Sequence, residues 1–171
     1  MKIQITGYSS SGKSTFAKKI AKHYQLPLLH IDTIYFKENW QKRDKHVIEK
    51  EIYDFIQKEA WIVDGQYRYL VPERYDVCDQ IFIFNFNRFK CLYGAIKRRL
   101  KYRRKQRDSI AKGCRERLDL SFVKWILWDG RKKDSRNLIK SIIAAHQDKT
   151  IVFKNRRQVN RYLKQIGYQQ S

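Results

Sequence analysis

Residues 2–15, Lys-Ile-Gln-Ile-Thr-Gly-Tyr-Ser-Ser-Ser-Gly-Lys-Ser-Thr, decide the fold of this 171-residue chain. The segment 2–6 alternates as a β-strand does, and from Lys13 onward the apolar residues recur at helical spacing. Between strand and helix, Gly7 to Ser14 match the pattern G-x-x-x-x-G-K-[ST] at every fixed position. A loop of this kind wraps backbone N–H groups around phosphate oxygens when a strand precedes it and a helix follows. The stretch therefore predicts a phosphate-binding loop at a nucleotide site.

The side chains of this loop predict which nucleotide and metal it takes. Lys13 is expected to reach the β- and γ-phosphates of ATP, and the Ser14 hydroxyl is expected to ligate Mg²⁺. No Asn-Lys-x-Asp stretch is present, which argues against a guanine-specific GTPase. The predicted nucleotide-binding residues of the loop are Gly7, Ser9, Ser10, Ser11, Gly12, Lys13, Ser14 and Thr15.

Strand-like and helix-like segments alternate along the rest of the chain. Further strands are predicted at 28–31, 61–63, 81–86 and 150–153. Helices are predicted at 13–24, 46–59, 88–105, 119–129, 135–146 and 156–166. This alternation predicts a single α/β domain over residues 1–171, with a five-stranded parallel sheet covered by helices on both faces.

Two acidic residues lie at or just beyond predicted strand ends. Asp32 follows the second strand and Asp64 follows the third, where it precedes Gly65. Ligands of parallel sheets gather at the carboxyl ends of the strands, so both carboxylates are predicted near Mg²⁺ or a substrate hydroxyl. The alternative for each is a helix cap or a loop carboxylate. His30 is expected to be a packed strand residue.

The chain is strongly basic, with 38 Lys and Arg against 17 Asp and Glu, a formal charge of +21. Thirteen of the basic residues lie between Arg88 and Arg117, opposed only by Asp108 and Glu116. Three interpretations remain open: a solvated helix face, mobile arginines that neutralise a transferred phosphoryl group, or a nucleic-acid footprint. The charge excess therefore predicts an anionic partner without choosing between nucleotide and nucleic acid.

Composition excludes several classes of protein. The three cysteines are too few and too widely spaced for a disulfide framework or a four-ligand zinc site. Lys and Arg interrupt every apolar run well short of the roughly 18 residues of a membrane span. The amino terminus has no signal-peptide core. We expect a cytoplasmic protein.

The motifs along the whole chain resemble those of the bacterial DNA topology modulation proteins, small P-loop proteins related to adenylate and shikimate kinases. The resemblance is carried by Gly7 to Ser14, Leu29-His30-Ile31-Asp32 with Tyr35 and Asn39-Trp40, Trp61-Ile62-Val63-Asp64-Gly65 with Tyr67, Asn87-Arg88 with Cys91-Leu92, Gly113-Cys114-x-Glu116-Arg117-Leu118-Asp119 with Phe122 and Lys124-Trp125, and Phe153-Lys154-Asn155-Arg156.

The resemblance implies an adenylate-kinase-like three-layer α/β/α sandwich with strand order 2-3-1-4-5 and a helical lid insertion. It places the phosphoryl acceptor near residues 33–60 and the lid near residues 100–118. The candidate transition-state arginines are then Arg98, Arg99 and Arg117. The implied substrate-binding residues are Asp32, Tyr35, Trp40, Asp64, Gly65 and Arg88, and Arg156 would approach the adenine.

One departure from the adenylate kinases concerns the acceptor. Their Asp-Gly strand end usually continues with an aromatic residue, proline and arginine, whereas Gln66-Tyr67-Arg68 follows here. This departure weakens an AMP-acceptor interpretation.

Three functional hypotheses follow. The first is a Mg²⁺- and ATP-dependent phosphotransferase of the nucleotide or small-metabolite kinase type, in which Lys13, Ser14, Asp32 and Asp64 organise triphosphate, metal and acceptor. The second is an ATP-binding, DNA-associated regulator that uses the nucleotide as a switch. The third is a kinase-like fold that binds ATP without transferring its phosphoryl group.

Overall fold

Strand β1 (Lys2–Gly7), which carries the phosphate-binding loop, lies in the middle of a five-stranded parallel sheet. The computed structural model describes residues 1–67, 69–116 and 118–169. The other strands are β2 (Leu28–His30), β3 (Trp61–Asp64), β4 (Gln80–Phe84) and β5 (Thr150–Phe153). Their order across the sheet is β2-β3-β1-β4-β5, every pair parallel. The predicted fold class and strand order are confirmed.

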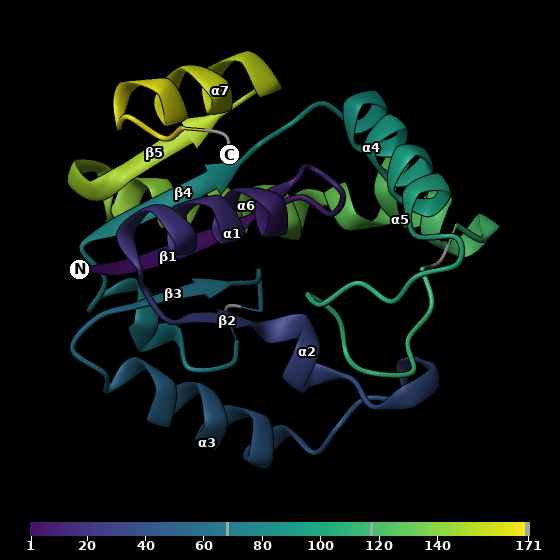
Figure 1. The fold of residues 1–171 in the computed structure, drawn as a ribbon, viewed down its shortest axis with the longest axis horizontal. Coiled ribbons are helices and arrows are strands. Elements are labelled where there is room, and N and C mark those ends of the chain that lie inside the picture. The colour runs from purple at the N-terminus through teal and green to yellow at the C-terminus, as the bar shows by residue number, and fades with distance from the viewer. Residues whose placement is uncertain (68, 117, 170–171) are drawn as a thin grey trace.

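In the part of the chain that the structure describes, seven α-helices connect and cover these strands. Figure 1 shows their arrangement. They are α1 (Lys13–Tyr24), α2 (Ile31–Tyr35), α3 (Lys45–Ile56), α4 (Arg88–Lys101), α5 (Leu120–Leu127), α6 (Lys133–Ala145) and α7 (Arg156–Gln165). Right-handed crossovers place α1 on one face of the sheet and α3 and α6 on the other. Figure 1 shows α4 and α5 beyond the carboxyl ends of the strands, on the side where β1 runs into the phosphate-binding loop.

Aromatic side chains hold α1 and α7 against β4 and β5. The Phe16 ring of α1 lies 5.0 Å from the Phe82 ring and 5.6 Å from the Phe153 ring, centroid to centroid. Tyr162 of α7 completes the cluster, 5.8 Å from Phe153. Edge-to-face and tilted contacts of this kind add to the free energy gained by burying the rings. They fix the start of α1, and with it the loop that precedes the helix.

Polar side chains cap four of the helices. Asp44 accepts hydrogen bonds from the backbone N–H groups of His46 and Val47 at the start of α3. Asn87, Asp119 and Asn155 do the same at the starts of α4, α5 and α7. Such caps satisfy N–H groups that the helix itself leaves unpaired. They explain why these helices begin close to the residues that the sequence indicates.

A buried arginine fixes the segment that follows β3. Arg74 has no exposed surface, and its guanidinium donates to the Gln4 side chain at 2.8 Å and to the Tyr67 carbonyl at 2.9 Å. It also donates to the carbonyls of Leu70 and Val71. The segment that presents Tyr67 and Tyr69 is therefore tied to the centre of the sheet.

Several elements end earlier than the sequence prediction, such as β4 at Phe84 and α3 at Ile56, and two differences bear on the site. Ile31 begins α2 instead of ending β2, so Asp32 lies in the first turn of a short helix. Helix α4 ends at Lys101, and the described residues of the α4–α5 connection, residues 102–119, contain no helix. Like charges crowd the end of α4 at Arg98, Arg99 and Lys101, which disfavours a further helical turn.

Among the described residues, no helix is both long and apolar enough to cross a membrane.

Candidate functional site

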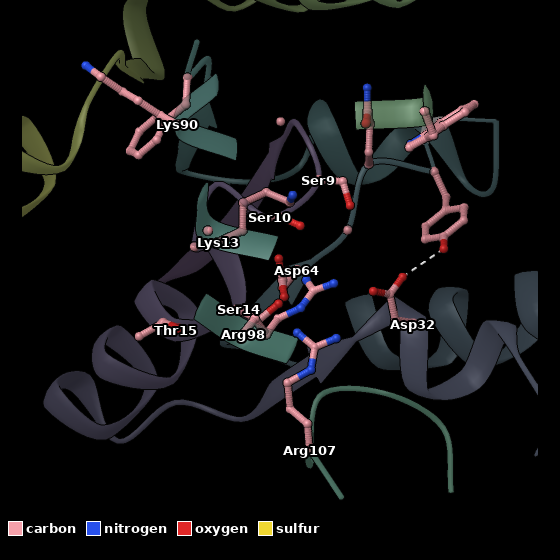
Figure 2. Close-up of a pocket in the computed structure, with 18 of the residues that line it drawn as sticks. Ser9, Ser10, Lys13, Ser14, Thr15, Asp32, Asp64, Lys90, Arg98 and Arg107 are labelled. Atoms are coloured by element: carbon pink, nitrogen blue, oxygen red, sulfur yellow. Dashed lines mark hydrogen bonds between the residues drawn. The ribbon is translucent and has the colours of Figure 1, made fainter. Parts of the chain in front are cut away.

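A cleft of about 1890 Å³ lies over the carboxyl ends of the strands. Pockets for one small ligand usually measure about 300–1,000 Å³, so the cleft has room for two. Figure 2 shows its polar side chains converging from the phosphate-binding loop, β3, α2 and α4. The predicted site residues that line it are Gly7, Ser9, Ser10, Gly12, Lys13, Ser14, Thr15, Asp32, Tyr35, Asp64, Gly65, Arg98 and Arg156.

Four other predicted residues lie outside this lining. Ser11 is buried beneath the loop, where its hydroxyl donates to the Tyr8 carbonyl at 2.7 Å. The Trp40 indole packs edge-on against Phe36 and donates to the Arg115 carbonyl. Arg88 and Arg99 of α4 are not among the residues of the cleft wall. Arg117 lies outside the described residues.

The phosphate-binding loop is shaped by close approaches from distant elements. Gly12 has φ +97°, and a Cβ there would lie 2.4 Å from the guanidinium of Arg156. A Cβ on Gly94 of α4 would lie 2.4 Å from the Ser10 carbonyl oxygen. The Arg131 guanidinium stacks on the Tyr8 ring, 3.8 Å from its centroid. Close contacts with Arg156, Gly94 and Arg131 therefore restrict the conformation of the loop.

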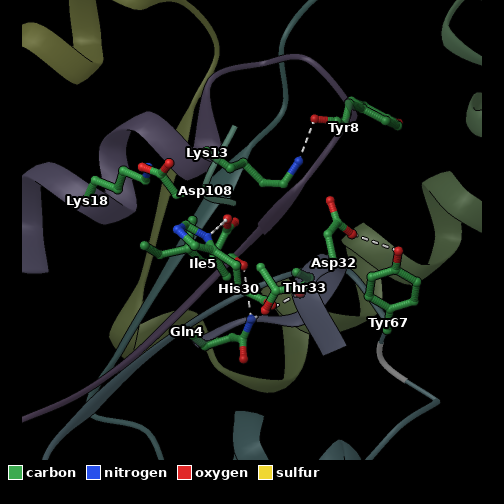
Figure 3. A network of polar contacts seen from close by, with 12 residues as sticks. Gln4, Ile5, Tyr8, Lys13, Lys18, His30, Asp32, Thr33, Tyr67 and Asp108 are labelled. Atoms are coloured by element: carbon green, nitrogen blue, oxygen red, sulfur yellow. Dashed lines mark hydrogen bonds and ion pairs between the residues drawn. The ribbon is translucent and has the colours of Figure 1, made fainter. Parts of the chain in front are cut away.

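Lys13 points back over the loop that precedes it. Its Nζ donates to the Tyr8 carbonyl at 2.7 Å (Figure 3). Burial lowers the pKa of Lys13, and the nearby carboxylates of Asp64 and Asp32 oppose that shift. A cation held in this way is ready to exchange the carbonyl for phosphate oxygens.

Asp64 is an ionised carboxylate at the end of β3. It is 5% exposed, and its Oδ2 lies 2.8 Å from Nδ1 of His30, its partner in the β2–β3 register. Burial alone would raise the pKa of Asp64. The hydrogen bond and charge of His30, the charge of Lys13 and the hydrogen bond of Ser14 hold the pKa below its usual range. His30 is buried as expected, but its contact with Asp64 was not predicted; the signal was their shared position at neighbouring strand ends.

The donor set beside Asp64 fits Mg²⁺. Ser14 and Asp64 line the cleft side by side (Figure 2), and the second carboxylate oxygen of Asp64, Oδ1, is buried without a hydrogen-bond partner. A hydroxyl and an ionised carboxylate are the oxygen ligands that Mg²⁺ takes, with water and phosphate completing its shell. No group of three or more His, Cys, Asp and Glu in the described part of the chain could hold a metal, so a cage built only from protein is not indicated there.

Asp32 faces the same space from α2. The Tyr67 hydroxyl donates to its Oδ1 at 2.7 Å. Burial and the repulsion of Asp64 raise the pKa of Asp32, while Tyr67, Lys13 and Arg107 partly oppose the shift. A carboxylate with a raised pKa is a better proton acceptor than an ordinary surface aspartate.

Three tyrosines form a wall beyond Asp32. The Tyr35 and Tyr67 rings are stacked with their centroids 4.3 Å apart, and the Tyr35 and Tyr69 hydroxyls are 2.9 Å apart. Burial and the charge of Asp32 raise the pKa of Tyr67, so its hydroxyl remains a donor to that carboxylate. Tyr67 and Tyr69 were not predicted as site residues, although the Tyr67 position belongs to the motif after β3.

Two arginines enter the cleft opposite the loop. Figure 2 shows the guanidinium groups of Arg98 and Arg107 next to each other between Asp64 and Asp32. The Arg98 Nε lies 2.6 Å from one Glu116 carboxylate oxygen, and the Arg107 Nε lies 2.8 Å from the other. Burial and the charge of Arg107 lower the pKa of Arg98, and Glu116 opposes that shift. Arg107 and Glu116 were not predicted as site residues, because nothing in a local motif distinguishes Arg107 from the other basic residues near it.

The α4–α5 connection, which carries Arg107 and Glu116, contacts helix α1 and the segment between α2 and α3. The Cys114 thiol donates to the Lys37 carbonyl at 3.1 Å. Asp108 pairs with Lys18 of α1 at 2.7 Å (Figure 3). Ile110, Ala111 and Cys114 form a small buried cluster against Phe36 and Trp40.

Of the comparisons with known proteins, the one with solved structures agrees with this fold. No family model matches the sequence, and no curated protein matches it. Among solved structures, shikimate kinase from Bacteroides thetaiotaomicron matches with a TM-score of 0.51 over 97% of this chain and 95% of that chain, at 13% sequence identity. At this identity the likeness shows the fold alone. The chain therefore shares its fold with this shikimate kinase, with a five-stranded parallel sheet in the order β2-β3-β1-β4-β5 in this chain.

Proposed function

We propose that the protein is a Mg²⁺- and ATP-dependent phosphotransferase that acts on a hydroxyl group of a small molecule. The observation that carries this proposal is the convergence of Lys13, Asp64 and Asp32 on one cleft with room for two ligands. Lys13 and Asp64 suit a metal-bound triphosphate, and Asp32, on the far side, suits a proton-bearing acceptor. A site that only bound nucleotide would not require this second carboxylate.

The residues divide the work between the two ligands. When bound, ATP supplies the γ-phosphoryl group and Mg²⁺ neutralises part of its charge. Ser14 and Asp64 would hold the metal, the loop backbone and Lys13 would hold the phosphates, and Arg156 would lie near the base. Asp32 would accept the proton of the acceptor hydroxyl as its oxygen bonds to phosphorus. Arg98, and in our proposal also Arg107 of the lid-like α4–α5 connection, would face the transferred group.

The acceptor end favours a molecule with a ring face beside its hydroxyl. Tyr35, Phe36, Tyr67 and Tyr69 line the cleft next to Asp32. Aromatic walls of this kind bind planar or apolar ring surfaces and use their hydroxyls to orient polar groups. Nucleosides, nucleotides and ring-bearing hydroxy-metabolites are therefore the acceptors to test first.

The deciding experiment is ADP release from MgATP in the presence of a panel of such acceptors. We expect one class of acceptor to accelerate ADP release well above the intrinsic rate, and the Asp32→Asn variant to lose that acceleration while still binding ATP. If no acceptor accelerates ADP release, the transferase proposal fails and nucleotide binding without transfer is the better description.

We infer nucleic-acid binding, as in a topology modulation protein, as a second candidate function. Its specific support is helix α4, where exposed basic residues, Lys90, Lys97 and Lys101, run beside an exposed apolar row, Phe89, Tyr93 and Leu100. All of these except Leu100 also line the cleft, so a nucleic acid would enter the same space as the nucleotide. Basic side chains bind backbone phosphates, and exposed aromatic rings can stack on bases. Binding of duplex and single-stranded DNA across a salt series tests it: a steep loss of affinity with salt is expected, and no binding at physiological ionic strength would reject it.

A further inference from the structure

The ion pairs of Glu116 give the cleft a feature that the nucleotide site does not explain. Its carboxylate is 2% exposed and contacts both Arg98, at 2.6 Å, and Arg107, at 2.8 Å. Arg98 comes from α4 and Arg107 from the α4–α5 connection, so the carboxylate joins two separate elements. Burying a carboxylate is costly unless it is paired, which makes two charged partners at these distances significant.

The Glu116 carboxylate holds the two arginines next to each other. Each Nε lies within 2.8 Å of a different Glu116 oxygen, as an ion pair without aligned hydrogen bonds. Figure 2 shows the two guanidinium groups side by side in the cleft, near Asp64 and Asp32. Arg98 is further held by the Phe122 ring, 5.8 Å from the guanidinium carbon. Because these contacts already restrain the two side chains, the side chains lose little conformational freedom when a ligand binds.

The surrounding charges show which ligand fits. Arg98 and Arg107 line the same cleft as Lys13 and Asp32 (Figure 2). The paired guanidinium groups therefore lie near both the proposed proton acceptor and the phosphate-binding lysine. An anionic group transferred from the loop toward Asp32 would pass in front of them, and planar guanidinium groups bind phosphoryl oxygens in two-point contacts.

We propose that Glu116 is a positioning residue that holds Arg98 and Arg107 together as one clamp on the terminal phosphoryl group. The proposal rests on the proposed phosphotransferase function and deepens it. It assigns a role to Arg107, which belongs to no motif, and to Glu116, which belongs to the motif that begins at Gly113. It also makes the α4–α5 connection part of the phosphoryl site, because Arg107 reaches the cleft from that segment.

The clamp can be tested without knowing the acceptor, by adding a mimic of the terminal phosphoryl group to bound ADP. We compare the dissociation constant of MgADP with that of MgADP in the presence of beryllium fluoride, by calorimetry. In the wild type we expect beryllium fluoride to tighten binding by about tenfold or more, since two charged donors contact the mimic. Arg98→Ala and Arg107→Ala should each lose most of this gain.

Glu116→Gln should lose most of the roughly tenfold gain in affinity that beryllium fluoride gives, as removal of a positioning partner does elsewhere. Its affinity for MgADP alone should change by less than about threefold, because the loop that binds ADP is untouched. Glu116→Asp, which keeps a shorter carboxylate, should recover part of the gain. Adding Glu116→Gln to the Arg98→Ala, Arg107→Ala double variant should have no further effect on binding.

Glu51→Gln is the matched control, because Glu51 pairs with Arg43 at 2.6 Å outside the cleft wall. It should leave both dissociation constants unchanged. A merely structural role for Glu116 would lower the melting temperature and leave the beryllium fluoride gain intact, which would overturn the proposal. A larger gain in Glu116→Gln would also overturn it, since Glu116 would then hold the arginines away from the phosphoryl group.

The failure of the underlying function gives a different result. If the wild type binds neither MgADP nor MgATP, the nucleotide site itself is wrong, and the clamp falls with it. If the wild type binds MgADP but beryllium fluoride adds no affinity, the nucleotide site stands and the clamp alone is rejected.

Discussion

The phosphate-binding loop and the α4–α5 connection both bring cations to the cleft, but they are held in different ways. Lys13 stands where β1 ends and α1 begins, so its position follows from a strand, a helix and the loop between them. Arg107 stands in a segment whose described residues contain no helix, and it is held by a buried carboxylate nine residues later. The first arrangement is local in sequence, and the second depends on tertiary contacts.

Lys13→Ala tests the phosphate-binding loop, the local arrangement of the two, and should have the largest effect on activity. Loss of the cation should reduce ATP turnover by about 10³-fold or more, since it removes charge stabilisation from the phosphates. The fold should persist, because the Nζ contacts only a loop carbonyl. Circular dichroism checks the fold and a coupled ADP assay checks turnover; near-normal turnover would place the phosphates elsewhere.

Asp32→Asn tests the proton acceptor and should reduce turnover by about 10²–10³-fold. Because the pKa of Asp32 is raised, turnover of the wild type should fall as the pH drops through that raised value. A pH-independent rate across the acidic range would contradict this role.

The carboxylates of Asp32 and Asp64 should have opposite effects on the stability of the folded protein. Folding raises the pKa of Asp32. The stabilisation that Asp32 gives the folded state is therefore fully present below its unfolded pKa of about 3.9, and it is lost as the pH rises through its folded pKa. Folding lowers the pKa of Asp64, so its contribution is present above that unfolded value and is lost as the pH falls through the folded one. At pH 7, Asp32→Asn should therefore raise the melting temperature and Asp64→Asn should lower it. Calorimetry of both variants decides, and equal signs would refute the assignment.

Gly94→Ala tests how closely α4 must approach the phosphate-binding loop. In an open helix this substitution would stabilise by about 1 kcal/mol. Here the new Cβ would meet the Ser10 carbonyl at 2.4 Å, so we expect destabilisation of about 1–3 kcal/mol and weaker ATP binding. Urea unfolding measures the sign, and a stabilised variant would show that the helix can move away freely.

Asp108→Asn should have the smallest effect. Its ion pair with Lys18 joins the α4–α5 connection to α1, but the Asp108 side chain is 86% exposed and water screens the contact. The variant should match the wild type in urea unfolding at physiological salt and in the gain from beryllium fluoride. A clear loss in either would show that this surface contact, and not only Glu116, holds the connection.

The features that the sequence predicts are those set by neighbouring residues, and the features that it misses depend on tertiary contacts. Helix α1 and the loop were predictable because glycine, lysine and apolar spacing act within a few residues of one another. The strand order was implied by the family resemblance and not by local spacing. Helix α2 was missed because Ile31 continues an apolar run that reads as strand. Arg107 and Glu116 were missed because a run of like charges has no period, and only the fold selects which arginine meets a buried carboxylate. The tyrosine wall depends on Arg74, whose complete burial no local pattern indicates.

The contact between Gly12 and Arg156 also bears on how the protein is made. The cleft is lined by residues of the phosphate-binding loop, such as Gly12 and Lys13, and by Asn155 to Arg157, more than 140 residues later. A ribosome must therefore synthesise the chain past Arg157 before the cleft is complete. Ligand binding would then protect only chains that extend past Arg157, and chains truncated before Arg156 would reach cellular proteases without that protection.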